Sequence, residues 1–191
     1  MSGSELSGSL LLRITALAVV IVFFQIGVVW EIPVFGVYID LSPLLVAFVG
    51  LRCGSVLGAA VGFAVGLLVD LALLQTLGVT SLIFTLIGYW CGRLRELRDP
   101  QAPLTPLFVG AVASAASLIG YSLMEFLLGV DAPVSLGLLR GIVVGVVVNT
   151  VVALPMWLIV RRSLERGLPD DPRRRRRRAY TTGGLSPLSR R

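Results

Sequence analysis

Long apolar stretches divide this chain into six segments, and their length restricts it to a membrane fold. The stretches are separated by turn residues or charges and cover residues 10–30, 36–51, 54–74, 79–94, 104–130 and 134–160. A helix needs about 20 apolar residues to cross the roughly 30 Å hydrocarbon core of a bilayer. The mean hydropathy of +0.89 is far from that of a soluble domain. We therefore predict an all-α integral membrane protein with six transmembrane helices.

The second stretch, residues 36–51, departs from a simple span. It is short, and it carries Asp40 and Pro43 within its apolar run. A broken, tilted or re-entrant helix is tolerated at membrane depth only where its freed backbone groups are buried in protein. The sequence leaves open whether this segment crosses the whole bilayer.

Arginine residues set the predicted orientation. All 17 basic residues are arginine, and cytoplasmic loops of membrane proteins carry an excess of positive charge. Six crossings from a cytoplasmic N-terminus leave only Arg140 off the cytoplasmic side, which then receives Arg13, Arg52, Arg93, Arg95, Arg98, Arg161, Arg162 and Arg166. A five-span arrangement without residues 36–51 would separate Arg13 from the others. We predict a multi-pass protein with both termini in the cytoplasm.

Three regions follow from this layout. Residues 1–9 form a short cytoplasmic N-terminus without a convincing cleavage site, residues 10–163 form the transmembrane domain, and residues 164–191 form a disordered, arginine-rich cytoplasmic tail. The tail holds a run of six basic side chains that attract anionic lipids at about 1 kcal/mol each near the surface. These are Arg173, Arg174, Arg175, Arg176, Arg177 and Arg178. No folded basic module accompanies the run, so no nucleic-acid binding is expected.

Small residues recur every fourth position in two of the stretches. One row is Gly54, Gly58, Gly62 and Gly66, which ends on Asp70, and the other is Gly137, Gly141, Gly145, Asn149 and Ala153. Such rows let another helix backbone approach closely, and close packing is what associates helices in lipid. Ala113, Ser117, Tyr121 and Glu125 give the fifth stretch a weaker version. The third, fifth and sixth spans are expected to form the packed centre.

Charges at bilayer depth need a partner, because each costs at least about 2.5 kcal/mol there. Asp40, Asp70, Glu125 and Arg140 reach a similar outer depth when counted from the ends of their spans. We expect Arg140 to pair with one of these acids, with Asp70 or Glu125 the favoured partner. A structural ion pair that fixes helix register and a proton or cation path both remain open, although no chain of titratable groups crosses the whole thickness.

Several catalytic templates are excluded by composition. The chain has no histidine, so imidazole catalysis and histidine-ligated metals are absent. Cys53 and Cys91 lack metal-type spacing and are expected to be small apolar fillers. No cofactor is expected, and a membrane enzyme that holds a divalent metal on Asp40 and Asp70 is the third-ranked alternative.

The central third of the chain carries a family resemblance. The ordered segments are DLSPLL at residues 40–45, GLRCG at 50–54, GFAVGLLVD at 62–70 and LGVTSLIFTLIGYWCGRL at 77–94. Together they resemble the bacterial rod shape-determining MreD family, whose recurrent polar positions match Asp40, Arg52, Asp70 and Arg93 here. The arginine-rich tail is a departure from the family pattern.

The resemblance implies a function and a fold. Family members are non-enzymatic subunits of the bacterial cell membrane that bind the single-span protein MreC. They act beside MreB, RodA and its partner transpeptidase to guide side-wall peptidoglycan synthesis and cell shape. Their fold is similar to the substrate-binding subunit (S component) of vitamin-importing ECF transporters. The alternative function is therefore such a transporter subunit, with an outward pocket near Asp40, Asp70, Glu125 and Arg140.

The candidate residues for helix packing or partner binding combine the polar positions with the glycine row. They are Asp40, Pro43, Arg52, Gly62, Gly66, Asp70, Arg93, Glu125, Arg140 and Asn149.

Overall fold

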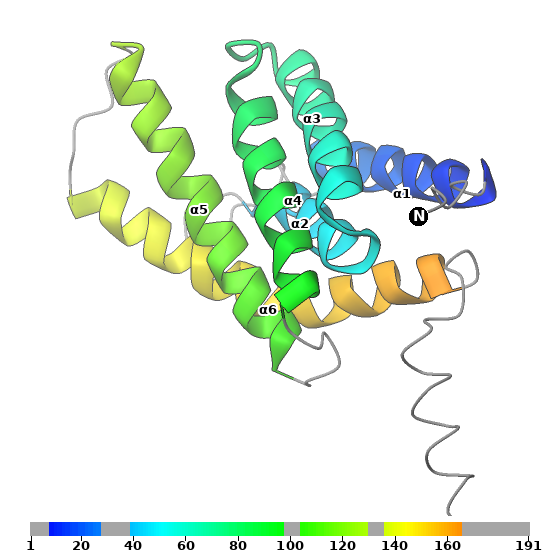
Figure 1. The fold of residues 1–191 in the computed structure, drawn as a ribbon. Coiled ribbons are helices and arrows are strands. Elements are labelled where there is room, and N and C mark those ends of the chain that lie inside the picture. Colours follow the sequence, from blue (N-terminus) through cyan, green and yellow to red (C-terminus); the bar gives the residue numbers. More distant parts are fainter. Residues whose placement is uncertain (1–7, 28–38, 98–103, 130–135, 166–191) are drawn as a thin grey trace, which may run out of the picture.

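The computed structural model describes residues 8–27, 39–97, 104–129 and 136–165, and these residues form six helices (Figure 1). The helices are α1 (Gly8–Gly27), α2 (Ser42–Cys53), α3 (Ser55–Ala72), α4 (Val79–Leu97), α5 (Thr105–Leu127) and α6 (Leu136–Glu165). Each of the six apolar stretches holds one helix, so the predicted all-α fold is confirmed. The arginine tail and its run at residues 173–178 lie outside the described residues.

The helices differ in their capacity to cross a bilayer. Among the described helices, α1, α3, α5 and α6 are long and apolar enough to do so. Helix α2 has 12 residues and rises only about 18 Å at 1.5 Å per residue. Helix α4 has 19 residues, but its last turns carry Arg93 and Arg95. Four helices with the dimensions of membrane spans make this a membrane protein.

The short helix α2 lies at the centre of the fold. Every residue from Ser42 to Leu51 is buried, and α2 contacts all five other helices. Pro43 stands in its first turn, where the missing N–H of proline costs nothing. Gly54 ends the helix at a φ of 101°, a conformation that favours glycine, and the chain turns directly into α3.

Helices α3 and α4 pack antiparallel with their backbones in contact. A Cβ atom added to Gly58 would meet the backbone of Gly88, one on Gly62 would meet Phe84, and one on Gly66 would meet Ser81, all closer than 3.0 Å. Each step of one turn along α3 matches a step of about one turn back along α4, so the two helices share one fixed register. The glycine row is the surface on which α4 lies.

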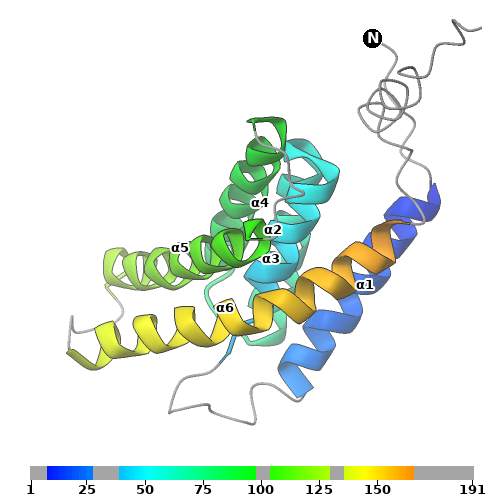
Figure 2. The same cartoon turned by 90° about the horizontal axis from the view of Figure 1, so that it is seen from below.

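The expected packed centre of the third, fifth and sixth spans is wrong. In the described part of the chain α3 contacts α1, α2 and α4 but neither α5 nor α6. Helices α5 and α6 run side by side (Figure 2), with Gly110 of α5 against Ala153 of α6 and Leu44 of α2. The pair α3–α4 and the pair α5–α6 therefore both pack on the buried helix α2.

Candidate functional site

Hydrogen bonds of buried polar side chains mark two places in this fold. The described ones are Gln25, Ser42, Asp70, Thr80, Ser81, Ser114, Ser117 and Asn149. Hydrogen bonds join Gln25 and Asn149 to the start of α2, and join Asp70 to the turn between α3 and α4. Polar groups away from water need such partners. We therefore take these two places as the candidate sites of this apolar molecule.

Two helices that are distant in sequence hold the start of α2. Gln25 of α1 donates from Nε2 to the carbonyl oxygen of Ile39 at 2.7 Å and accepts from the backbone N–H of Leu41 at 2.9 Å. Asn149 of α6 donates from Nδ2 to the carbonyl oxygen of Asp40 at 3.1 Å. These side chains satisfy backbone groups that a short buried helix leaves free.

Asp40 completes this arrangement from within the same segment. Its Oδ1 accepts a hydrogen bond from the backbone N–H of Ser42 at 2.9 Å. A carboxylate there also lies near the positive end of the α2 dipole. The segment 39–42 is thus fixed by Asp40, Gln25 and Asn149, and Asp40 and Asn149 meet here although 109 residues separate them.

Asp70 ties the end of α3 to the start of α4. Its side chain is fully buried, and Oδ2 accepts from the backbone N–H of Gly78 at 2.8 Å. Its carbonyl oxygen accepts from the backbone N–H of Gln75 at 3.0 Å, and Gly78 accepts in turn from Leu82 in the first turn of α4. Asp70 therefore closes the turn and places a carboxylate at the N-terminus of α4, where negative charge is favoured.

We predict that the hydrogen bond from Gly78 to Asp70 stabilises the turn. Asp70→Ala removes the acceptor, whereas Asp70→Asn keeps an amide oxygen in a similar place. The Asn variant should be more stable than the Ala variant by about 1 kcal/mol, the usual contribution of a capping group. Thermal unfolding in detergent measures the difference. An Ala variant as stable as the Asn variant would contradict this role.

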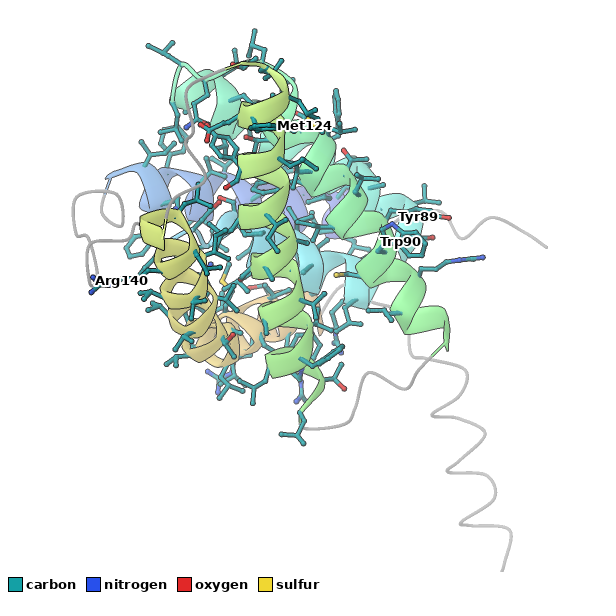
Figure 3. The ribbon with its side chains drawn as sticks, turned by 90° about the vertical axis from the view of Figure 1, so that its left-hand side faces the viewer. Tyr89, Trp90, Met124 and Arg140 are labelled. Carbon is teal, nitrogen blue, oxygen red and sulfur yellow. The ribbon has the colours of Figure 1, made fainter. Side chains whose placement is uncertain are left out.

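A pocket of about 220 Å³ lies beside this turn and the end of α5. We call it the turn pocket, and it is lined by Leu74, Gln75, Thr76, Val79, Tyr121, Glu125 and Leu128. Figure 3 marks this end of α5 with Met124. The side chain of Glu125 is half-buried, and it lies within hydrogen-bonding reach of Tyr121.

Arg140 lies apart from these acids. Its side chain is exposed and points away from the helices (Figure 3). Within the described ranges no ion pair joins Arg140 to Asp70 or Glu125, so the expected pairing is wrong. Arg140 and Arg161 are 21 residues apart on α6, about 31 Å at 1.5 Å per residue. That spacing matches the bilayer core, so both guanidinium groups can reach headgroups.

The other predicted arginines lie at the opposite end of the molecule from the turn pocket. Arg52, in the last turn of α2, places its guanidinium 5.7 Å from the centre of the Trp157 ring, within the range of a cation–π interaction. Trp157 packs edge-on against Phe48 with ring centres 5.4 Å apart. Arg93 is exposed near the end of α4. Cys53 and Cys91 are free cysteines, half-buried and buried respectively.

The sequence interpretation missed Gln25 and Trp157 as structural partners. Gln25 is the only amide side chain in α1, and a buried amide in an apolar span was the available signal. Nothing in the sequence pairs it with residues 39–41. Across the described residues, no group of three or more His, Cys, Asp or Glu side chains is placed to hold a metal ion.

The comparisons with known proteins give one match. A family model described as rod shape-determining protein MreD matches residues 8–166. No curated protein and no solved structure matches the chain.

Proposed function

This chain belongs to the MreD family of rod shape-determining proteins, and from that membership we propose that it is a non-enzymatic membrane subunit of the cell-elongation complex. In this role it binds an MreC-type single-span protein beside MreB, RodA and its transpeptidase. The assembly gives spatial control of side-wall peptidoglycan synthesis and so of cell shape.

The filled centre of the fold carries the proposal. Residues Ser42–Leu51 of α2 are buried from all sides, and Gly50, Gly58 and Gly88 bring the backbones of α2, α3 and α4 into contact. A helix therefore occupies the space that a transport path or a large ligand cavity would need. Rigid close packing suits a subunit that presents a fixed surface to other membrane helices.

The distribution of arginine supports the proposed orientation. Gly92 of α4 lies against Ser55, so Arg93 and Arg52 share one end of the molecule, and Trp157 brings the end of α6 to the same place. Figure 2 shows the start of α1 beside the end of α6. We propose that this end faces the cytoplasm with both termini, that residues 10–163 form the membrane domain, and that the tail binds anionic lipid.

The proposal predicts a loss of rod shape when the α3–α4 contact is disrupted. Gly62→Leu and Gly66→Leu insert side chains where the backbone of α4 already lies, so the subunit should fail to assemble and rod-shaped cells should become round. Gly141→Leu is the matched control, because nothing lies within 4 Å of its added Cβ. Cell width by microscopy and co-purification of the MreC-type protein measure the effect. Normal shape and an intact complex after deletion of the gene would refute the proposal.

The turn pocket supports one alternative function, the substrate-binding subunit of a vitamin-type ECF transporter, whose six-helix fold we expect to be similar. Its volume of about 220 Å³ is below the roughly 300–1,000 Å³ of most small-molecule sites. A vitamin that remains bound through purification, or vitamin import restored by this gene, would favour the alternative.

A further inference from the structure

Among the described residues, the turn pocket holds a carboxylate but no cation to balance it. Its lining includes the carboxylate of Glu125 and the hydroxyl of Tyr121 but, among the described residues, no arginine. Asp70, which accepts a hydrogen bond from Gly78 of the adjoining turn, is not part of this lining. Arg140, the cation that the sequence suggested for this place, is exposed elsewhere on α6.

The side chain of Asp70 is a second, independent indication that a hydrogen-bond donor binds at this end of the fold. Its side chain is 0% exposed, and only Oδ2 is engaged, by the N–H of Gly78. Oδ1 is buried without a hydrogen-bond partner in the described part of the chain. A carboxylate buried in this state is costly unless positive charge lies nearby, so positive charge at this end of the fold would stabilise Asp70.

The remaining lining residues match the chemistry of an arginine side chain. Leu74, Val79 and Leu128 offer apolar surface for its methylene stem, and Gln75, Thr76 and Glu125 offer oxygen acceptors. A guanidinium group presents five N–H donors in a planar fork that suits a carboxylate with neighbouring acceptors. An ammonium group would carry the same charge but would form hydrogen bonds to fewer of these acceptors than a guanidinium group.

We propose that the turn pocket binds an arginine side chain of the partner protein, from the segment that flanks its membrane span on the side of the α3–α4 turn. The inference rests on the proposed function, because it assigns a contact to the single-span partner. Glu125 pairs directly with the guanidinium, and Tyr121, one helical turn before it on α5, lines the same pocket. The pocket thus fixes the depth and rotation of the partner helix against α4 and α5.

The test is co-purification of the full-length protein with the MreC-type partner from membranes, with Glu125 varied. Glu125→Gln removes the charge at nearly constant shape and should reduce partner recovery at least tenfold at physiological salt. Glu125→Asp keeps the charge and should retain most of it. Glu125→Arg should abolish recovery, and exchanging one arginine of the partner segment for glutamate should restore it.

Two controls separate the possible failures. Thermal unfolding and yield of each variant in detergent should equal those of the parent, because Glu125 is only half-buried at the end of α5. A parent protein that does not recover the partner contradicts the proposed function itself. A parent that recovers the partner while Glu125→Gln and Glu125→Arg recover it equally well overturns only this inference. Loss of a lipid amine from the variants in native mass spectra, with partner binding unchanged, also overturns it.

Discussion

Adding one methyl group at Gly62 should destabilise this protein by about 3 kcal/mol or more, the upper range for overpacking a core. The new Cβ in Gly62→Ala would overlap the backbone of Phe84 and Thr85 in α4. A backbone cannot rotate away as a flexible side chain can, so α3 and α4 must separate along their length. Helix propensity acts in the other direction, because alanine is favoured over glycine by about 1 kcal/mol in a helix interior. Any loss therefore measures the helix contact.

Gly141→Ala is the matched control for this prediction. Gly141 lies in the other glycine row, but an added Cβ there has nothing within 4 Å. The same substitution should leave the melting temperature in detergent unchanged or raise it slightly through propensity. Equal stability of Gly62→Ala and Gly141→Ala would show that the α3–α4 backbones are not in contact.

The contrast between the two glycine rows shows which helix contacts can be predicted from the sequence and which cannot. Spacing of four residues predicts a groove on each helix, and Gly58, Gly62 and Gly66 do form one. The pattern does not say which helix fills it. Helix α4 fills the groove and contributes Gly88 and Gly92 to the contact. Its segment also contains threonine, tyrosine and arginine residues, so its small-residue face is not evident from the sequence. In the similar row on α6, Gly141 has nothing within 4 Å of an added Cβ, whereas Asn149 and Ala153 are buried, and no property of the sequence indicates this difference.

The central position of α2 could not be predicted from the sequence either. The sequence leaves open whether the short segment with Asp40 and Pro43 crosses the whole bilayer or is broken, tilted or re-entrant, and its helix has 12 residues, fewer than a full span needs. Its burial depends on Gln25 and Asn149, which belong to the first and last helices. Such contacts between distant segments follow from the whole packing and leave no local pattern.

The charged residues also differ in how well the sequence predicts their positions. Asp70 lies at the end of the glycine row, and its position in sequence marked it as a residue that fixes helix register. Its actual partner, the N–H of Gly78, is only eight residues away and belongs to the turn. Arg140 has the opposite outcome, because its depth in the sequence predicts a paired charge, whereas its side chain is exposed near the start of α6.

Gln25→Leu should be the most damaging single change at the start of α2. Leucine fills a similar volume but leaves the carbonyl of Ile39 and the N–H of Leu41 without the partners that now lie 2.7 and 2.9 Å away. Each buried backbone group left unpaired costs about 1–3 kcal/mol, and lipid offers no water to replace the amide. We expect a total loss of about 2–6 kcal/mol in detergent unfolding.

Hydrogen exchange locates the effect of Gln25→Leu, because the amide of Leu41 loses its acceptor and the first turn of α2 should exchange faster than that of α3. Ser114→Ala is the control within the core. Its hydroxyl is fully buried and, among the described residues, makes no hydrogen bond, so its removal leaves no partner unpaired and should not lower stability. If Gln25→Leu unfolds and exchanges like the parent, the amide does not hold α2, and the burial of this short helix must then depend on apolar packing alone.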